Sequence, residues 1–324
     1  MIKIQIDKNA KMEIEDIYIK DAHRAQTGIF RVMEKANVKA KLQKDFPKIH
    51  DALYDPTTGE PEEEKIKKLL LADRKELKEY ISMFGHYNAN QTKYLLENVF
   101  IYDRYARRRS ACQILDRMGV TVCPYCNRQY IHTVASGKAR PQLDHYYPKK
   151  LYPYLAVSLY NMIPSCSICN MAKSLLDTLK TPVVYPFDEE FGYDAKFEIQ
   201  IKGRNNYVKV MEGISDEFVI DLNAKKANNA AEINTQMQKL HLDELYSKHT
   251  DYVMDIIKSK NINTPERIHE ICKTFPKLFG SNDEVKNILY MTDLGKESWG
   301  KRPLSKLTHD IDMQLESGNI SYVK

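Results

Sequence analysis

The spacing of apolar and polar positions predicts helices over most of the first 118 residues. The clearest case is GEPEEEKIKKLLLADRKELKEYISMFG, in which apolar side chains recur at helical spacing from Ile66 to Phe84. Pro61 suits a first turn, the acidic residues 62–64 favour the positive end of the helix dipole, and Gly85 can terminate the helix. We therefore expect one long helix here, with its apolar face in the core rather than against a partner helix.

A second helical pattern runs from about Asn90 to Met118 and contains YDRYARRRS. Helical spacing places Arg104, Arg107 and Arg108 on one face, where they could contact phosphates. The alternative is a solvated surface with tyrosines packed beneath it. The pattern alone leaves both interpretations open.

After residue 181 the pattern changes, and three segments show the apolar–polar alternation of strands. These segments are KFEIQIKG, YVKVM and EFVIDL. Helical periodicity returns from Ile233 to Ile257 and continues to the end, with breaks near NINTP and FPKLFGSND. We expect Trp299, the single tryptophan, to close the core rather than to anchor a partner.

Together these patterns predict an α+β protein, mainly helical, in three regions. Residues 1–118 form a helical region, residues 119–180 a central module that contains two Cys-x-x-Cys pairs, and residues 181–324 an accessory region of strands and helices. The composition, 43% hydrophobic and 29% charged, is ordinary for a globular protein. We find neither an apolar run near the ~18 residues of a membrane span nor a signal peptide, so we expect a cytoplasmic protein.

Positive charge is concentrated in one segment. Residues 101–150 contain ten Lys and Arg but three Asp and Glu, whereas the net charge of the whole chain is only +5. A local excess says more about partners than the whole-chain value does. It coincides with the cysteine motifs and fits a polyanionic substrate.

The cysteine pattern favours a metal site. Six cysteines in 324 residues do not indicate a disulfide scaffold. Cys112 and Cys272 stand alone and are expected to be small core residues. A redox role for the Cys-x-x-Cys pairs is weaker, because a thioredoxin-like context is missing. Two such pairs supply the four thiolates that tetrahedral structural Zn²⁺ prefers, namely Cys123, Cys126, Cys166 and Cys169.

The segment between the two pairs is unusually long. It comprises 39 residues, whereas a zinc ribbon has ~15–20. NRQYIHTV, the SGK turn and ARPQLDHYY read as a hairpin with Gly137 in its turn and a strand on either side. The insert therefore predicts a structural element carried between the two knuckles.

This insert carries residues suited to phosphodiester hydrolysis. Asp144 and His145 end the predicted second strand, and Asn170 follows Cys169 at the start of a predicted helix. If the zinc holds this helix against the hairpin, Asn170 faces Asp144, and their oxygens suit Mg²⁺ or Mn²⁺. An imidazole with a pKa near ~6.5 can take a proton from water at neutral pH, which would make His145 a general base.

Other polar residues could support this reaction. Asn161 could clamp the loop beside the histidine, and Lys173, one helical turn beyond Asn170, could contact a phosphate. We also consider Arg140 and Lys149 as phosphate contacts. Each residue has a structural alternative, since a lone histidine is usually not catalytic and Asp and Asn often serve as turn or cap residues.

The order of these residues resembles a known family. CPYC, LDHYYPK and SLYNMIPSCSICNMAK together resemble the HNH nucleases, which are zinc-framed ββα-metal (His-Me finger) endonucleases. The resemblance covers roughly residues 121–178, and the final histidine of the family name is replaced by asparagine, as in many members. It implies that His145 is the general base and that Asn161 orders the loop. It also implies that Asp144 and Asn170 hold one catalytic cation. It also implies that the four paired cysteines hold structural zinc.

The stretch SLYNMIPSC and the long helical flanks also resemble HNH subunits of bacterial anti-phage systems. In Septu-type pairs such a nuclease works with an ABC/SMC-like ATPase, which implies docking surfaces in the flanking regions. The expected function is a metal-dependent endonuclease acting on DNA. Two alternatives remain: a non-catalytic zinc module that binds nucleic acid or scaffolds a complex, and an HNH nuclease acting on RNA.

Overall fold

The protein has an α+β fold, about half helical, with two small sheets among the residues described. The computed structural model describes residues 1–134 and 136–323. Contacts within the chain define two compact units: unit 1 comprises Met1–Lys3, Thr121–Tyr130 and Asp188–Lys324, and unit 2 comprises Ile4–Val120 and Ile131–Phe187. The three regions expected from sequence divide the chain at other residues than these two units do, and they remain a prediction.

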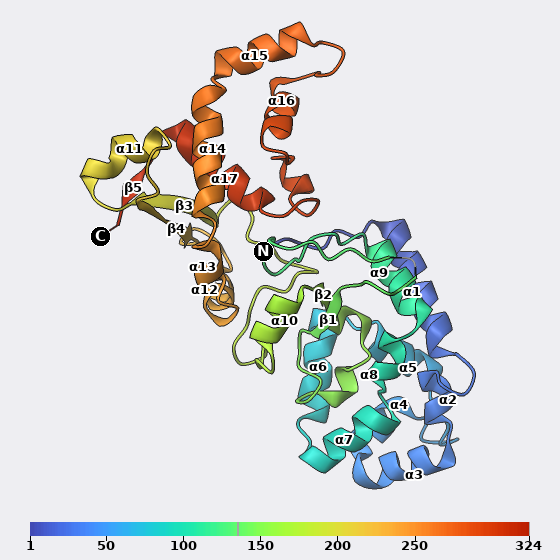
Figure 1. The fold of residues 1–324 in the computed structure, drawn as a ribbon. Helices are drawn as coiled ribbons and strands as arrows, with labels where there is room; N and C mark the ends of the chain where they lie inside the picture. Colours follow the sequence, from blue (N-terminus) through green and yellow to red (C-terminus); the bar gives the residue numbers. More distant parts are fainter. Residues whose placement is uncertain (135, 324) are drawn as a thin grey trace. The chain divides into compact units, whose positions relative to one another are not determined.

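Unit 2 is a set of short helices followed by a small ββα element (Figure 1). Helix α1 packs against α9, and α6 contacts the 3₁₀ turn η2. The helices are α1 (Lys8–Ala22), α2 (Ile29–Met33), α3 (Ala36–Asp45), α4 (Pro47–Leu53), α5 (Glu63–Leu70), α6 (Arg74–Phe84), α7 (Ala89–Asn98), α8 (Tyr102–Ala106) and α9 (Arg109–Met118). They are followed by β1 (Gln142–His145), η1 (Pro153–Leu155), η2 (Leu159–Asn161), β2 (Met162–Ser165) and α10 (Ser167–Lys173).

The single helix expected after Pro61 is wrong, because the chain forms α5 and α6 with a break between them. Asp73 caps α6 in a capping box, in which its side chain accepts the Glu76 N–H and the Glu76 side chain accepts the Asp73 N–H. This local bonding favours a new helix start over continuation of α5. Gly85 does end α6, with φ of 70°. The run after Asn90 is likewise divided, into α7, α8 and α9.

The ββα element differs from the expected hairpin around Gly137. Strand β1 pairs antiparallel with β2, in a register that places Asp144 opposite Ile163 and His145 opposite Met162. Around Gly137 the chain makes a tight turn, and residues 131–134 form no strand. The expected second strand is therefore confirmed as β1, which ends at His145, whereas the expected first strand is wrong, and β1 pairs with β2, whose four residues are all buried. Helix α10 follows β2 directly and contacts β1 (Figure 1).

Unit 1 combines a three-stranded sheet with helices. The strand order is β4-β3-β5; β3 pairs antiparallel with β4 and parallel with β5, and α17 packs against β3. The elements are β3 (Lys196–Ile201), η3 (Arg204–Asn206), α11 (Tyr207–Met211), β4 (Phe218–Asn223), α12 (Ala230–Lys239), α13 (Leu242–Tyr246), α14 (Thr250–Ile262), α15 (Pro265–Thr274), α16 (Asn282–Leu289), η4 (Lys296–Ser298), α17 (Ser305–Ser317) and β5 (Ser321–Tyr322).

Two of the three strands expected from sequence are confirmed as β3 and β4. The third, YVKVM, is wrong, since these residues form helix α11, in which Val210 alone is buried. A five-residue segment is too short for its apolar positions to distinguish the two periodicities, so tertiary context decides. The breaks expected near NINTP and FPKLFGSND are confirmed, because α14 ends at Ile262 and α15 and α16 are separate.

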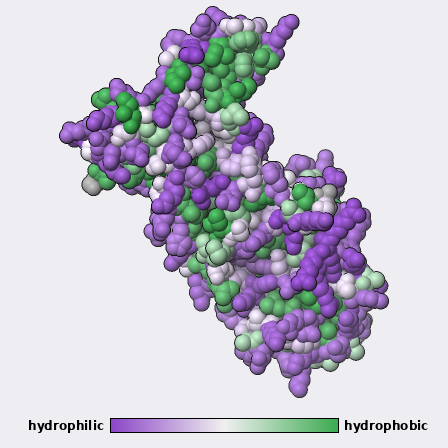
Figure 2. All heavy atoms as spheres, viewed as in Figure 1, coloured by the Kyte–Doolittle hydropathy of each residue, from purple (hydrophilic) through white to green (hydrophobic). Residues whose placement is uncertain are grey.

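Aromatic and apolar side chains form the cores, and Trp299 is buried as expected. Figure 2 shows a mostly hydrophilic face with hydrophobic side chains gathered over α15 and α16. Five large apolar side chains of this part of unit 1 are 50–71% exposed: Ile262, Phe275, Leu278, Ile288 and Met291. Among the described residues, none of the helices has the length and apolar character required to cross a membrane.

Candidate metal centre and candidate active-site pocket

The four paired cysteines form a buried cluster. The Sγ atoms of Cys123, Cys126, Cys166 and Cys169 all lie within 4.8 Å of one another. In each pair a backbone N–H points at sulfur, from Arg128 to Cys126 and from Cys169 to Cys166, both at 3.4 Å. Four thiolates are the donor set of structural zinc, so the cluster could hold Zn²⁺.

The first cysteine pair is embedded in unit 1. Asn127, directly after Cys126, has φ of 49° and makes several bonds. Its Nδ2 donates to the Trp299 carbonyl, its Oδ1 accepts the Lys306 N–H, and its own carbonyl accepts the Leu304 N–H. The Tyr246 hydroxyl donates to the Cys126 carbonyl at 2.7 Å. The C-terminal region thus fixes the shape of this knuckle, which the sequence did not indicate.

Asp144, His145 and Asn170 line one open pocket of unit 2, with a volume of about 520 Å³. We call it the His145 pocket. These three side chains lie close together because β1 ends at His145 and because Asn170 lies on α10, which packs against β1. Its other lining residues are Tyr102, Arg140, Pro141, Gln142, Leu143, Pro148, Lys149, Lys150, Ser174 and Leu175.

The imidazole of His145 is held in a defined orientation. Its Nε2 lies 2.9 Å from the carbonyl oxygen of Ala156. Because a carbonyl can only accept, Nε2 carries the proton and Nδ1 keeps a lone pair. The ring also meets Tyr102 edge to face, with the centroids 4.5 Å apart. This arrangement leaves one nitrogen able to accept a proton.

Burial keeps this imidazole neutral. Desolvation is the main cause that lowers the pKa of His145 to about 3; the hydrogen bond to Ala156 opposes the shift, and the positive charges of Lys149 and Lys173 contribute to it. The group therefore carries no charge at neutral pH. An anion placed in the pocket would favour the protonated ring and raise this pKa.

Asp144 is engaged in a buried ion pair with Lys173. The Nζ atom lies 3.0 Å and 3.2 Å from the two carboxylate oxygens and donates to the His145 carbonyl at 2.7 Å. The Lys173 side chain is 0% exposed. The lysine expected to contact a phosphate is thus turned inward in this structure and neutralises the carboxylate.

The oxygen donors fit a hard divalent cation in their chemistry. Asp144 contributes a carboxylate, and Asn170 donates through Nδ2 to the Gln142 Oε1 at 2.6 Å, so its own amide oxygen remains an acceptor. Both residues line the same pocket. The ammonium group of Lys173 already supplies one positive charge to Asp144, so a bound cation would share or replace this contact.

Asn161 ties together the loop that follows β1. Its Oδ1 accepts the Tyr147 N–H at 2.8 Å, and its Nδ2 donates to the carbonyls of Tyr147 and Leu155 at 3.1 Å and 3.0 Å. Leu155 directly precedes Ala156, which orients His145. The side chain is fully buried. These bonds hold the loop that leads to Ala156, and the role of Asn161 in a reaction stays a prediction.

The expected basic residues occupy different environments. Arg140 and Lys149 line the His145 pocket, and Arg140 also lines a second pocket of about 640 Å³ with Arg107 and Arg109. Arg104 is exposed on α8. Arg109 was not identified from sequence, although it belongs to the same RRR run.

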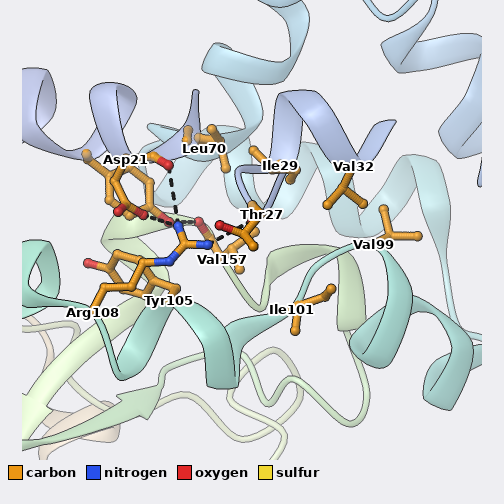
Figure 3. A pocket seen from close by; sticks show the side chains of 12 residues that line it. Asp21, Thr27, Ile29, Val32, Leu70, Val99, Ile101, Tyr105, Arg108 and Val157 are labelled. Atoms are coloured by element: carbon orange, nitrogen blue, oxygen red, sulfur yellow. Dashed lines mark hydrogen bonds and ion pairs between the residues drawn. The ribbon is translucent and has the colours of Figure 1, made fainter. Parts of the chain in front are cut away.

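Arg108 points inward rather than to solvent (Figure 3). Its guanidinium pairs with Asp21 of α1 and donates to the Thr27 carbonyl at 2.8 Å, and its side chain is 12% exposed. Since these bonds use the guanidinium to join α1 to α9, the expected shared basic face of three arginines is wrong at this residue. Tyr18, beside this pair, donates to the carbonyl of Val157, the neighbour of Ala156.

The residues described above define a buried four-cysteine cluster and a histidine–carboxylate–amide pocket on a ββα element. No family model matches the chain, and no solved structure matches it significantly. The chain is similar to the Septu protein PtuB from Bacillus thuringiensis, with 26% identity over 147 residues. This match covers 45% of the chain and 47% of the relative, so it spans about half the length of either.

Proposed function

We propose that the protein is a metal-dependent HNH-type endonuclease that hydrolyses phosphodiester bonds of DNA. One observation carries the proposal: the proton-accepting Nδ1 of His145, the carboxylate of Asp144 and the amide of Asn170 belong to one pocket rimmed by basic side chains. A structural zinc site needs none of these three residues. Their combination therefore favours a reaction centre over a purely structural module.

Each residue has a distinct role in the proposed reaction. His145 takes a proton from the attacking water at Nδ1 while Ala156 holds Nε2. Asp144 and Asn170 would hold a divalent cation, Mg²⁺ or Mn²⁺, which would supply Lewis-acid stabilisation of the phosphate charge. Asn161 positions the histidine through the loop, and Arg140 and Lys149 contact flanking phosphates.

Replacement of His145 by Ala tests the proposal. We expect plasmid nicking in Mg²⁺ or Mn²⁺ to disappear, while zinc content and the circular dichroism spectrum stay unchanged. A removed general base typically lowers a rate by about 10²–10⁴-fold. Undiminished cleavage by the variant would contradict the proposed mechanism. Parallel DNA and RNA substrates distinguish the two polymers, and zinc-dependent binding without any cleavage would favour the scaffold alternative.

We further infer that the protein acts in a Septu-like anti-phage system together with a partner protein, for which the similarity to PtuB is the support. An ABC/SMC-like ATPase is the expected partner.

The exposed apolar side chains at the end of α14, on α16 and in the segments that follow α15 and α16 offer a surface of the kind that proteins bind. Co-purification with an ATPase from the same operon tests this, and it should be lost in Phe275→Asp/Leu278→Asp but kept in the surface control Lys75→Asp. Equal co-purification of both variants would exclude this surface.

A further inference from the structure

A third open pocket of unit 2 adjoins the His145 pocket. It has a volume of about 490 Å³ and lies between α7, α8 and the loop after β1. The two pockets share Tyr102, Lys149 and Lys150, so one side of the His145 pocket is also a wall of this one. We call it the side pocket. Its remaining lining residues are Tyr87, Ala89, Thr92, Lys93, Leu96, Glu97 and Asp103.

Tyr102 links the two pockets physically. One edge-to-face contact joins its ring to the imidazole of His145, and the Nζ atom of Lys149 lies 4.1 Å from its ring centroid. A ligand that packs on Tyr102 from the side pocket is therefore separated from His145 only by the Tyr102 side chain.

The lining of the side pocket combines an aromatic surface with positive charge. Tyr87 and Tyr102 provide rings, Leu96 provides an apolar contact, and Lys93 and Lys150 are exposed cations. Aromatic faces bind nucleobases regardless of their sequence, and lysines bind phosphates as point charges. A nucleotide carries both of the groups that this lining can bind, a base and a phosphate.

The acidic residues do not cancel this character. Asp103 lies 3.6 Å from Lys149, which balances its charge. Glu97 is exposed, and a carboxylate at the edge of a base site can accept from an exocyclic amino group. Three lysines against two acids leave the side pocket net positive, and its volume lies within the ~300–1,000 Å³ range of small-molecule sites.

We propose that the side pocket holds one unpaired nucleotide of the nucleic acid that is cut at His145, with its base against Tyr87 and Tyr102 and its phosphate near Lys93 and Lys150. The inference rests on the proposed nuclease function and restricts the class of DNA that would be its substrate. A base within an intact duplex has its faces covered by its neighbours and must leave the stack to enter such a pocket. The substrate is therefore single-stranded DNA, or a duplex with an unpaired nucleotide next to the cut.

Binding measurements on the cleavage-deficient His145→Ala protein test the proposal. Fluorescence anisotropy compares a fully paired duplex with the same duplex carrying one unpaired nucleotide. We expect the second to bind roughly tenfold more tightly, as one base–aromatic stack allows. Tyr87→Ala and Lys93→Ala, which line the side pocket alone, should remove this preference. Tyr80→Ala and Lys75→Ala, on α6, are the matched controls and should retain it.

The outcomes separate this inference from the proposed function. Equal binding of both substrates, or a preference that survives Tyr87→Ala, overturns the side pocket as a nucleotide site even where the wild-type protein cleaves DNA. A mononucleotide that competes as well as the oligonucleotide overturns it in favour of a free-nucleotide site. A preference that depends on Tyr87, combined with no cleavage under any metal, supports the side pocket and contradicts the nuclease function.

Discussion

The contact between Lys173 and Asp144 is the main residue-scale feature of the proposed site. A carboxylate that is 3% exposed is unfavourable without a positive partner, and Lys173 provides one together with a bond to the His145 carbonyl. The same carboxylate is the proposed cation ligand. The lysine therefore stabilises the buried carboxylate, and it would compete with the proposed cation for Asp144.

Replacement of Lys173 by Met tests this competition. Loss of one partner of a buried ion pair should lower the free energy of unfolding by about 3–5 kcal/mol. Because Mg²⁺ can supply the missing charge at Asp144, the variant should gain more in melting temperature from Mg²⁺ than the wild type does. Thermal melts with and without Mg²⁺ measure both effects.

Lys75→Met is the control, since Lys75 is exposed on α6. Its stability should change by no more than about 0.5 kcal/mol. Equal Mg²⁺ stabilisation of the wild type and Lys173→Met would show that the ammonium and the cation do not compete for Asp144.

At the scale of elements, the break between α5 and α6 supports the site from a distance. Helix α6 contacts η2, the turn that contains Asn161. The Ser158 hydroxyl donates to the Leu69 carbonyl on α5, and the Tyr154 hydroxyl donates to the Gly85 carbonyl after α6. The corner between these helices therefore lies beside the bond to Ser158, while the far end of α6 accepts from Tyr154, and these two residues flank Ala156, whose carbonyl orients His145.

Replacement of Asp73 by Ala should weaken this corner. The capping box satisfies N–H groups at the start of α6, and loss of an N-cap side chain costs about 1 kcal/mol. Urea unfolding of the variant measures the change, with Lys75→Ala in the same first turn as the control. An unchanged midpoint would mean that the cap contributes nothing to stability.

Elements that depend on the local pattern of apolar residues were predictable from sequence. Elements that depend on pairing with a strand far along the chain were not. β3 and β4 alternate clearly over six residues, whereas YVKVM is too short to distinguish a strand from the helix it forms. The hairpin around Gly137 was a reasonable local solution, but the partner of β1 begins at Met162, beyond a loop that local pattern cannot cross.

The candidate site shows the same division. Asp144, His145 and Asn170 were identified by residue type and order, and the structure places them around one pocket. The burial of Lys173 and Arg108 was not predictable, because a basic side chain is ordinarily exposed and its acidic partner lies 29 or 87 residues away. Tyr102 was missed, since a tyrosine in the first turn of the short helix α8 has no distinctive spacing.

At the scale of the whole molecule, the C-terminal region of unit 1 supports the first cysteine pair. Asn127 bonds to Trp299, Leu304 and Lys306. Lys306 in turn forms a buried ion pair with Asp310 at 2.7 Å, and Asp310 accepts the Phe197 N–H of β3 at 2.9 Å. This pair thus connects the knuckle, α17 and the sheet within one unit.

The pair also predicts how stability depends on pH. Burial raises the pKa of Asp310 to about 6, although Lys306 and the Phe197 N–H oppose the shift. The folded state thus binds this proton more tightly than the unfolded state, whose pKa is about 3.9. The contribution to stability is present below pH 4 and is lost as pH rises through 6, by about 3 kcal/mol for a shift of about two units.

The double variant Lys306→Met/Asp310→Asn should not show this loss. The asparagine keeps an acceptor for the Phe197 N–H, and an uncharged buried pair is often no less stable than an ionic one. Urea unfolding at pH 4.5 and pH 7 should show the wild type losing stability relative to the double variant as pH rises. Asp310→Ala, which leaves the lysine without its partner, should cost about 3–5 kcal/mol at pH 7. Parallel pH profiles for the wild type and the double variant would mean that Asp310 does not titrate in this range, and the pair would then be ionic throughout.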